Sequence, residues 1–186
     1  MGTWYNIKSA AIGWFGNILV YKYPLFIQLG HTAYKINGKH QREILDCLEP
    51  GDVLLRRYDN YLSGLILPGY FTHAAIYIGD NKIIHMLGDG IVKEDILTFM
   101  RCDDIAVLRT KVETGRAPAV SKAEEYLKDK IQYDFDFKFS DDKRFSCTEL
   151  IHNCYDYFPI KDPMRKNMVL PDDFLHSPYF QHIWRK

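Results

Sequence analysis

Residues 72–87 read THAAIYIGDNKIIHML and decide the fold. Two runs rich in apolar, β-branched and aromatic residues flank Gly79-Asp80-Asn81, a turn sequence that joins antiparallel strands. Each run carries one histidine, His73 in the first and His85 in the second. The sequence therefore predicts a β-hairpin with two histidines on neighbouring strands.

Working outward from this hairpin, strands are expected in the middle of the chain and helices on both sides of them. The further strands predicted from turn signals and β-branched runs are 53–55, 91–93 and 105–111. The helices predicted from apolar periodicity are 96–101, 118–131 and 146–157. This arrangement is typical of the α+β class.

Cys147 lies at the start of the last of these helices, in Phe145-Ser146-Cys147-Thr148-Glu149-Leu150. The unpaired backbone N–H groups and the positive end of the helix dipole at that position favour the thiolate, which is the nucleophilic form of cysteine. A lone cysteine there is more often a buried core residue. Together with His73 and His85, however, Cys147 is better interpreted as a nucleophile.

His73 and His85 each stand in an otherwise apolar strand, where an imidazole is costly to bury without a partner. A pair of histidines can serve as a base and as the group that holds the tautomer of that base. We expect both rings on the same side of the sheet as Cys147, with His73 within about 4 Å of the sulfur. Two alternatives stay open: hydrogen-bonded core histidines, and a zinc site of two histidines and one cysteine. No His-x-x-x-His or Cys-x-x-Cys pair supports zinc, so no metal is predicted.

These segments, together with Gly51-Asp52-Val53, Tyr133-Asp134 and Pro171-Asp172-Asp173-Phe174, resemble the permuted NlpC/P60 group of papain-like proteins. The likeness is closest to the YiiX/YaeF-like amidases and more distant to the lecithin:retinol acyltransferase relatives. In that group the histidine strand precedes the cysteine helix, the reverse of the order in papain, and this chain follows the permuted order. The resemblance covers about residues 50–180. It implies a circularly permuted papain-like fold, with a central antiparallel sheet packed against helices.

The resemblance also implies roles for individual residues. Cys147 matches the nucleophile, His73 the general base and His85 the third polar position, while Tyr133 matches a tyrosine that lines the substrate site. The implied activity is that of a cysteine-dependent amidase that forms a thioester acyl-enzyme and needs no cofactor. The implied substrate is an amide of a lipid-linked amino acid or a peptide. A lipid acyltransferase or phospholipase of the same fold, and an inactive binding module, are the alternatives.

Charge and cysteine usage bear on the partners and the compartment. Lys plus Arg and Asp plus Glu number 24 each, so no net field favours nucleic acid, and no nucleic-acid partner is expected. The four cysteines fit no disulfide framework or zinc motif and are expected to be free thiols, as in a reducing compartment. No signal-peptide cleavage pattern follows the first apolar stretch. The sequence therefore predicts a cytoplasmic protein.

Residues 1–45 are predicted to form an N-terminal helical extension, and residues 46–186 the permuted papain-like catalytic domain. The extension is too short and too often interrupted for a transmembrane helix. Its apolar residues have the spacing of an interfacial helix face, which is compatible with peripheral membrane contact: Trp4, Ile7, Ala11, Trp14, Phe15 and Ile18. The alternative is that this face packs on the catalytic domain.

Overall fold

The computed structural model describes residues 3–16, 34–59, 69–136, 143–156 and 168–186. The end of the predicted interfacial face at Ile18 and the last residue of the predicted helix 146–157 lie outside these ranges. No helix within them is long and apolar enough to span a bilayer.

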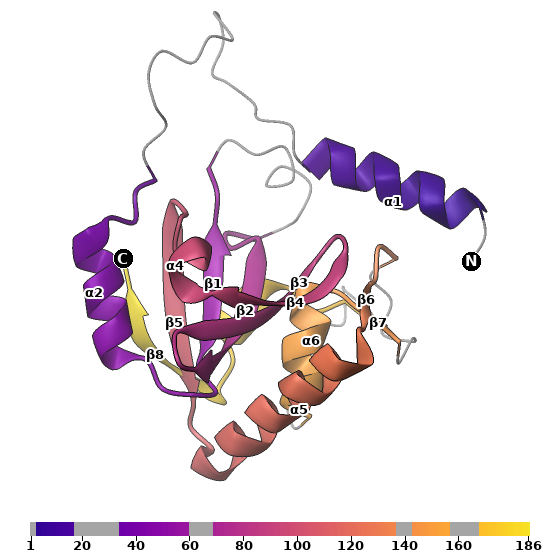
Figure 1. Cartoon of the computed structure of the whole chain (residues 1–186). Coiled ribbons are helices and arrows are strands. Elements are labelled where there is room, and N and C mark those ends of the chain that lie inside the picture. Colours follow the sequence, from indigo (N-terminus) through magenta and orange to yellow (C-terminus); the bar gives the residue numbers. More distant parts are fainter. Residues whose placement is uncertain (1–2, 17–33, 60–68, 137–142, 157–167) are drawn as a thin grey trace, which may run out of the picture.

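A six-stranded antiparallel sheet forms the centre of the molecule, with the strand order β4-β3-β2-β1-β5-β8 (Figure 1). The strands are β1 (Val53–Arg57), β2 (His73–Gly79), β3 (Lys82–Leu87), β4 (Gly90–Asp95), β5 (Asp104–Thr110) and β8 (Phe180–Arg185). The predicted hairpin is β2–β3. Asp80 and Asn81 take the left-handed conformation in its turn, with φ of 50° and 57°, as a tight antiparallel hairpin requires.

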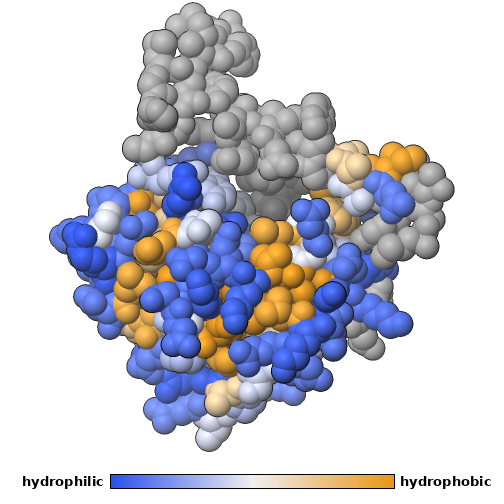
Figure 2. Space-filling model, viewed as in Figure 1, coloured by the Kyte–Doolittle hydropathy of each residue, from blue (hydrophilic) through white to orange (hydrophobic). Residues whose placement is uncertain are grey.

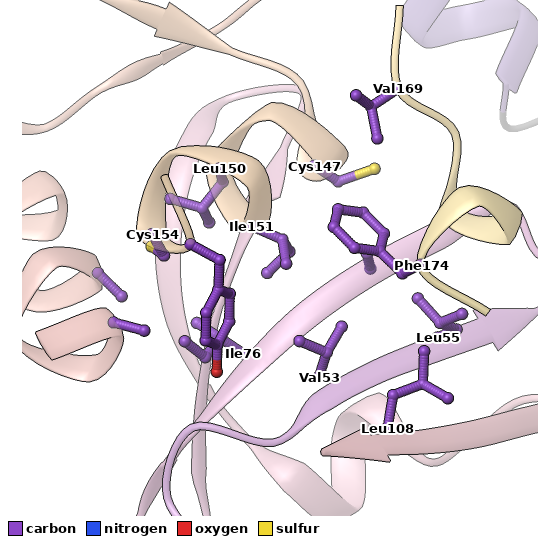
Figure 3. Close-up of a cluster of buried hydrophobic side chains, with 14 of the residues drawn as sticks. Val53, Leu55, Ile76, Leu108, Cys147, Leu150, Ile151, Cys154, Val169 and Phe174 are labelled. Atoms are coloured by element: carbon purple, nitrogen blue, oxygen red, sulfur yellow. The ribbon is translucent and has the colours of Figure 1, made fainter. Parts of the chain in front are cut away.

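One face of the sheet is covered by α5 (Arg116–Asp129), α6 (Cys147–Cys154) and α7 (Pro171–Leu175). Alternate strand residues such as Val53, Ala74 and Ile76 point to this face and pack with the buried side of α6 (Figure 3). Cys147 belongs to this first core. It is 6% exposed.

The opposite face is covered by α2 (Gly38–Cys47) and α4 (Ile96–Phe99). Leu54, Ala75 and Ile83, the neighbours of the residues that face the first core, point here and pack with Ile44 and Phe99. The predicted domain boundary between residues 45 and 46 falls within α2, and Ile44 on that helix is fully buried. The compact body therefore begins before that boundary.

The turn before β1 is built around Asp52, whose side chain is fully buried. Arg109 on β5 donates to both carboxylate oxygens, from Nε and Nη2, each at 2.7 Å. The backbone N–H of Glu49 donates to Oδ2 at 2.9 Å. Gly51 beside it has φ +92°, and a Cβ there would lie 2.8 Å from the Cβ of Arg116. The sequence Gly51-Asp52 thus joins α2, β1, β5 and α5 through one turn.

The α+β class, with a central antiparallel sheet packed against helices, is confirmed. The sequence prediction missed β8, α7 and a two-stranded parallel pair, β6 (Gln132–Tyr133) and β7 (Arg144–Phe145), all of which are short or lack clear alternation. The remaining elements are α1 (Thr3–Gly16) and a 3₁₀ turn, η1 (Glu113–Gly115). The face of the molecule in Figure 2 is mainly hydrophilic, with hydrophobic patches between the hydrophilic residues.

Candidate active site

Cys147 is the first residue of α6, and the start of this helix is fixed by a capping box. The Ser146 hydroxyl accepts from the backbone N–H of Glu149 at 3.3 Å, and the Glu149 carboxylate accepts from that of Ser146 at 2.6 Å. Thr148 donates from its hydroxyl to the carbonyl of Val169 at 2.7 Å. These contacts hold the thiol in one place at the helix start, beside Val169 and Phe174 (Figure 3).

Three backbone N–H groups act on the Cys147 thiol: those of Ala74, Thr148 and Cys147 itself. They lower the pKa of the thiol, as expected at a helix start. Burial outweighs them and raises the pKa to about 11. The expected preference for the thiolate is therefore not met in the resting site, and Cys147 is a protonated thiol near neutral pH.

His73 and His85 face each other across the β2–β3 hairpin, as expected. Nε2 of His73 lies 2.8 Å from Nδ1 of His85, and the ring planes are nearly perpendicular, at 75°. Phe99 packs against both rings, with centroid distances of 5.9 Å to His73 and 5.7 Å to His85. Because Nε2 of His73 is occupied by His85, Nδ1 is the His73 ring nitrogen left without a hydrogen bond among the described residues.

Cys147 and the two histidines do not share one face of the sheet, contrary to expectation. Strand alternation places Ala74 on the side of Cys147, and His73 with Ala75 on the side of Phe99. Within the described residues no hydrogen bond joins His73 to Cys147. Cys147 nevertheless packs in the same core as Ala74, the residue that follows His73, and the backbone N–H of Ala74 lowers the pKa of the thiol.

Both imidazoles are neutral near pH 7. Burial and the positive charge of Arg56 lower the pKa of His85 to about 3. Burial, Arg56 and then His85 hold the pKa of His73 well below its usual value. Neutral imidazoles can accept a proton, so the pair has the protonation state of a general base and its supporting partner.

Two further side chains belong to this cluster, and sequence reasoning missed both. Glu94 on β4 has Oε2 at 3.3 Å from Nε2 of His85, without the alignment of a hydrogen bond. Arg56 on β1 lies opposite His73 in the strand register. The alternation of β4 places Glu94 on the same side as Val92, the residue opposite His85, which is the signal that could have found it.

Tyr133 lies on β6 and stacks at a tilt on Phe135, with a centroid distance of 4.7 Å. Burial raises the pKa of its phenol well above the usual value, and the charges that Cys147, Glu149 and Asp134 carry when ionised raise it further. Tyr133 also packs against the first core, to which Cys147 belongs.

The described residues contain no cluster of three or more His, Cys, Asp and Glu side chains that could hold a metal ion. The facing nitrogens of His73 and His85 bond to each other at 2.8 Å, so these two atoms are not free to share a metal. This arrangement does not fit the zinc site considered from the sequence.

Known proteins share features of this sequence and of this fold. Residues 47–183 match the family described as permuted papain-like amidase enzyme, YaeF/YiiX, C92 family. Among solved structures, the fold is similar to that of yiiX from Escherichia coli O157:H7, described as a metalloprotein. The TM-score is 0.56 and the sequence identity 15%, over 75% of this chain and 98% of that one. The search of curated proteins gave no match.

A cysteine at the start of a helix and a preceding histidine strand on an antiparallel sheet define a cysteine hydrolase of permuted papain-like fold. The chain belongs to the YaeF/YiiX family of permuted papain-like amidases, C92, whose match spans most of its length.

Proposed function

We propose that this protein hydrolyses the amide bond between an acyl group and an amino acid or peptide, through a thioester on Cys147. The observation that carries the proposal is the setting of the sulfur: a buried thiol at a helix start, where backbone N–H groups act to lower its pKa, beside the β2–β3 hairpin that bears two neutral imidazoles. Buried N–H groups at a fixed site stabilise negative charge that develops during acyl transfer.

The tautomers follow from the hydrogen-bond chain. For Nδ1 of His73 to act as a base, the ring proton of His73 must be on Nε2, where it is donated to Nδ1 of His85. The proton of His85 is then on Nε2, facing the Glu94 carboxylate at 3.3 Å. Glu94 and His85 thus favour the tautomer of His73 that can take a proton.

In the first half-reaction, Cys147 transfers its proton to Nδ1 of His73 as the sulfur attacks the amide carbonyl carbon. In the resting structure the His73 ring lies on the Phe99 side of β2, so this transfer requires the side chain to turn at the strand end, which breaks its hydrogen bond to His85. The backbone N–H of Cys147 holds the oxyanion, a contribution of ~3 kcal/mol per donor. The C–N bond then breaks, and His73 gives its proton to the leaving amine.

In the second half-reaction, water attacks the thioester and gives its proton to His73. The C–S bond breaks, the carboxylic acid leaves, and the proton returns from His73 to Cys147. Because the pKa of the resting thiol is raised to about 11, proton transfer accompanies attack and no preformed thiolate–imidazolium pair is needed.

We further propose that the acyl group is a lipid chain and that Tyr133 lines its site. The family resemblance supports a lipid amide, and the Tyr133–Phe135 pair near Cys147 supports an apolar lining. The free state of all four cysteines supports a cytoplasmic location.

The test is hydrolysis of N-decanoyl-L-alanine, followed by release of alanine and by intact mass. Wild type should release alanine and, when quenched during turnover, carry a decanoyl adduct on Cys147. C147S and H73Q should both lose release of alanine, whereas C154A, which removes another buried thiol of α6, should retain it. Absence of both release and adduct with acyl-amino acid and acyl-peptide substrates would favour the inactive binding module.

A further inference from the structure

We propose that Arg56 is an anion-binding residue that receives a carboxylate or phosphate on the amine side of the substrate. The inference rests on the proposed amidase function and narrows its substrate class to amides whose leaving amine carries a nearby negative charge. N-acyl amino acids with a free α-carboxylate are the simplest members of this class.

Arg56 is a permanent cation placed beside the imidazole pair. It lies opposite His73 in the β1–β2 register. Its guanidinium stacks over the ring of Phe99, at 4.3 Å from the centroid, and over that of Tyr58, at 5.0 Å. Phe99 also packs against both histidine rings, so one aromatic ring contacts the cation and the two imidazoles.

The guanidinium has no carboxylate partner among the described residues. Its Nη1 donates at 3.5 Å to the carbonyl of Phe99, and its buried Nε has no hydrogen-bond partner. Arg57, Arg109 and Arg116, in contrast, each pair with an aspartate or glutamate. Arg56 is only 9% exposed, and a buried cation without a counter-ion is unfavourable. An incoming anion supplies the missing partner, and the planar guanidinium matches carboxylate and phosphate oxygens.

The position of Arg56 assigns the anion to the amine side of the scissile bond. His73, its cross-strand neighbour, is the group proposed to protonate the leaving amine, so an anion on Arg56 must lie close to that nitrogen. The α-carboxylate of an amino acid and the phosphate of a phosphoamino alcohol both meet this requirement.

Binding of this anion has a consequence for the base. The positive charge of Arg56 lowers the pKa of His73 and of His85. A bound carboxylate offsets that charge and raises the basicity of His73 when a substrate with the correct anion is in place. The same contact thus contributes to selectivity and to activation.

The kinetic test compares N-decanoyl-L-alanine, N-decanoyl-L-alaninamide and N-decanoyl-phosphoethanolamine on the full-length protein. For wild type, kcat/KM should be roughly 10- to 100-fold higher for the preferred anion than for the neutral carboxamide, the range of a charged hydrogen bond. R56Q should reduce this ratio to near one and R56K should restore part of it. R101Q, which removes an exposed arginine stacked on Tyr34, should leave the ratio unchanged. Equal hydrolysis of all three by wild type, or an equal loss on all three in R56Q, would overturn the proposal.

A second measurement tests anion binding by Arg56 in the absence of turnover. In C147A, the pKa of His73 followed by NMR should rise when sodium propionate is added, and R56Q in the same background should show no such rise. Absence of the rise in C147A overturns the anion site even if the amides are cleaved. A rise that depends on Arg56, with no cleavage of any amide by wild type, supports the anion site and rejects the amidase function.

Discussion

Glu94 Oε2 lies 3.3 Å from Nε2 of His85, on the opposite side of that imidazole from His73. Glu94 and His85 are diagonal neighbours on β4 and β3, and the carboxylate is partly exposed while the imidazole is fully buried. The two histidines and this carboxylate form a polar series that leads from His73 to the surface, and Cys147 lies on the other side of β2.

We expect E94Q to lower kcat by about 10-fold, in the range of losses seen when an outer partner of a functional histidine is removed. The neutral amide no longer holds the Nε2 proton of His85 by charge, so His73 takes the reactive tautomer less often. E94D should recover part of kcat, and E113Q, a change at an exposed glutamate, should have no effect. The pH–rate profile of E94Q should also shift. A change in Tm with an unaltered profile would contradict the positioning role.

The buried thiol gives a distinctive dependence of alkylation on pH. Because the pKa of Cys147 is raised to about 11, its thiolate fraction grows about tenfold per pH unit between 7 and 10. Inactivation by iodoacetamide should rise with the same slope and show no plateau near neutral pH. Peptide mapping should locate the label at Cys147, with partly exposed Cys47 as the internal comparison. A plateau below pH 8 would indicate a preformed thiolate–imidazolium pair instead.

The hairpin, the flanking helices and the order of histidine strand and cysteine helix were all predictable from local sequence. Gly79-Asp80-Asn81 specifies its turn, and Cys147 marks the start of α6, because turn and capping preferences act over a few residues. These features fixed the fold class and the candidate nucleophile. The structure contains the predicted hairpin, as β2–β3, and the helix that Cys147 begins, as α6.

The less predictable features depend on three-dimensional contacts between distant segments. Arg56 and Glu94 join the histidines only through the pairing of β1 with β2 and of β3 with β4. Which face of β2 meets Cys147 depends on how α6 packs on the sheet. The helix-start effect on the thiol was correctly anticipated, but the larger opposing effect of burial is a property of the packed core.

The neutral histidine pair predicts a loss of stability in acid. The pKa of His85 is about 3 in the folded protein and near 6.5 when unfolded, so the unfolded state binds the extra proton between these values. The free energy of unfolding should therefore fall as pH falls from 6.5 towards 3, by up to about 1.4 kcal/mol per unit for this group. Urea unfolding at pH 7, 6, 5 and 4 measures the slope. H85Q should have a shallower slope, and equal slopes for H85Q and wild type would contradict the assignment.

Asp172 on α7 holds the segment that leads into the histidine strand. Its carboxylate accepts from the backbone N–H of Tyr70 at 2.5 Å and from that of Phe71 at 2.9 Å. A Cβ on Gly69, which has φ +116°, would lie 2.9 Å from the same carboxylate. D172N replaces an acceptor by a donor facing an N–H, so we expect about 1–3 kcal/mol of lost stability and a lower kcat. D89N, in an exposed turn, is the control for loss of one negative charge.

Helix α1 lies to one side of the sheet (Figure 1). Lys8 on this helix forms an ion pair with Asp136, while Ile7 is 57% and Ile12 37% exposed. These two apolar side chains are therefore available for insertion into a bilayer surface rather than committed to the core. Full-length protein should float with phosphatidylcholine vesicles, and the double variant I7E/I12E should float several-fold less with an unchanged Tm. L97E alters a leucine on α4 whose exposed fraction, 48%, lies between those of Ile7 and Ile12, and it should float like wild type. If I7E/I12E floats normally but melts at a lower temperature, this face of α1 packs on the catalytic domain and membrane contact through it is rejected.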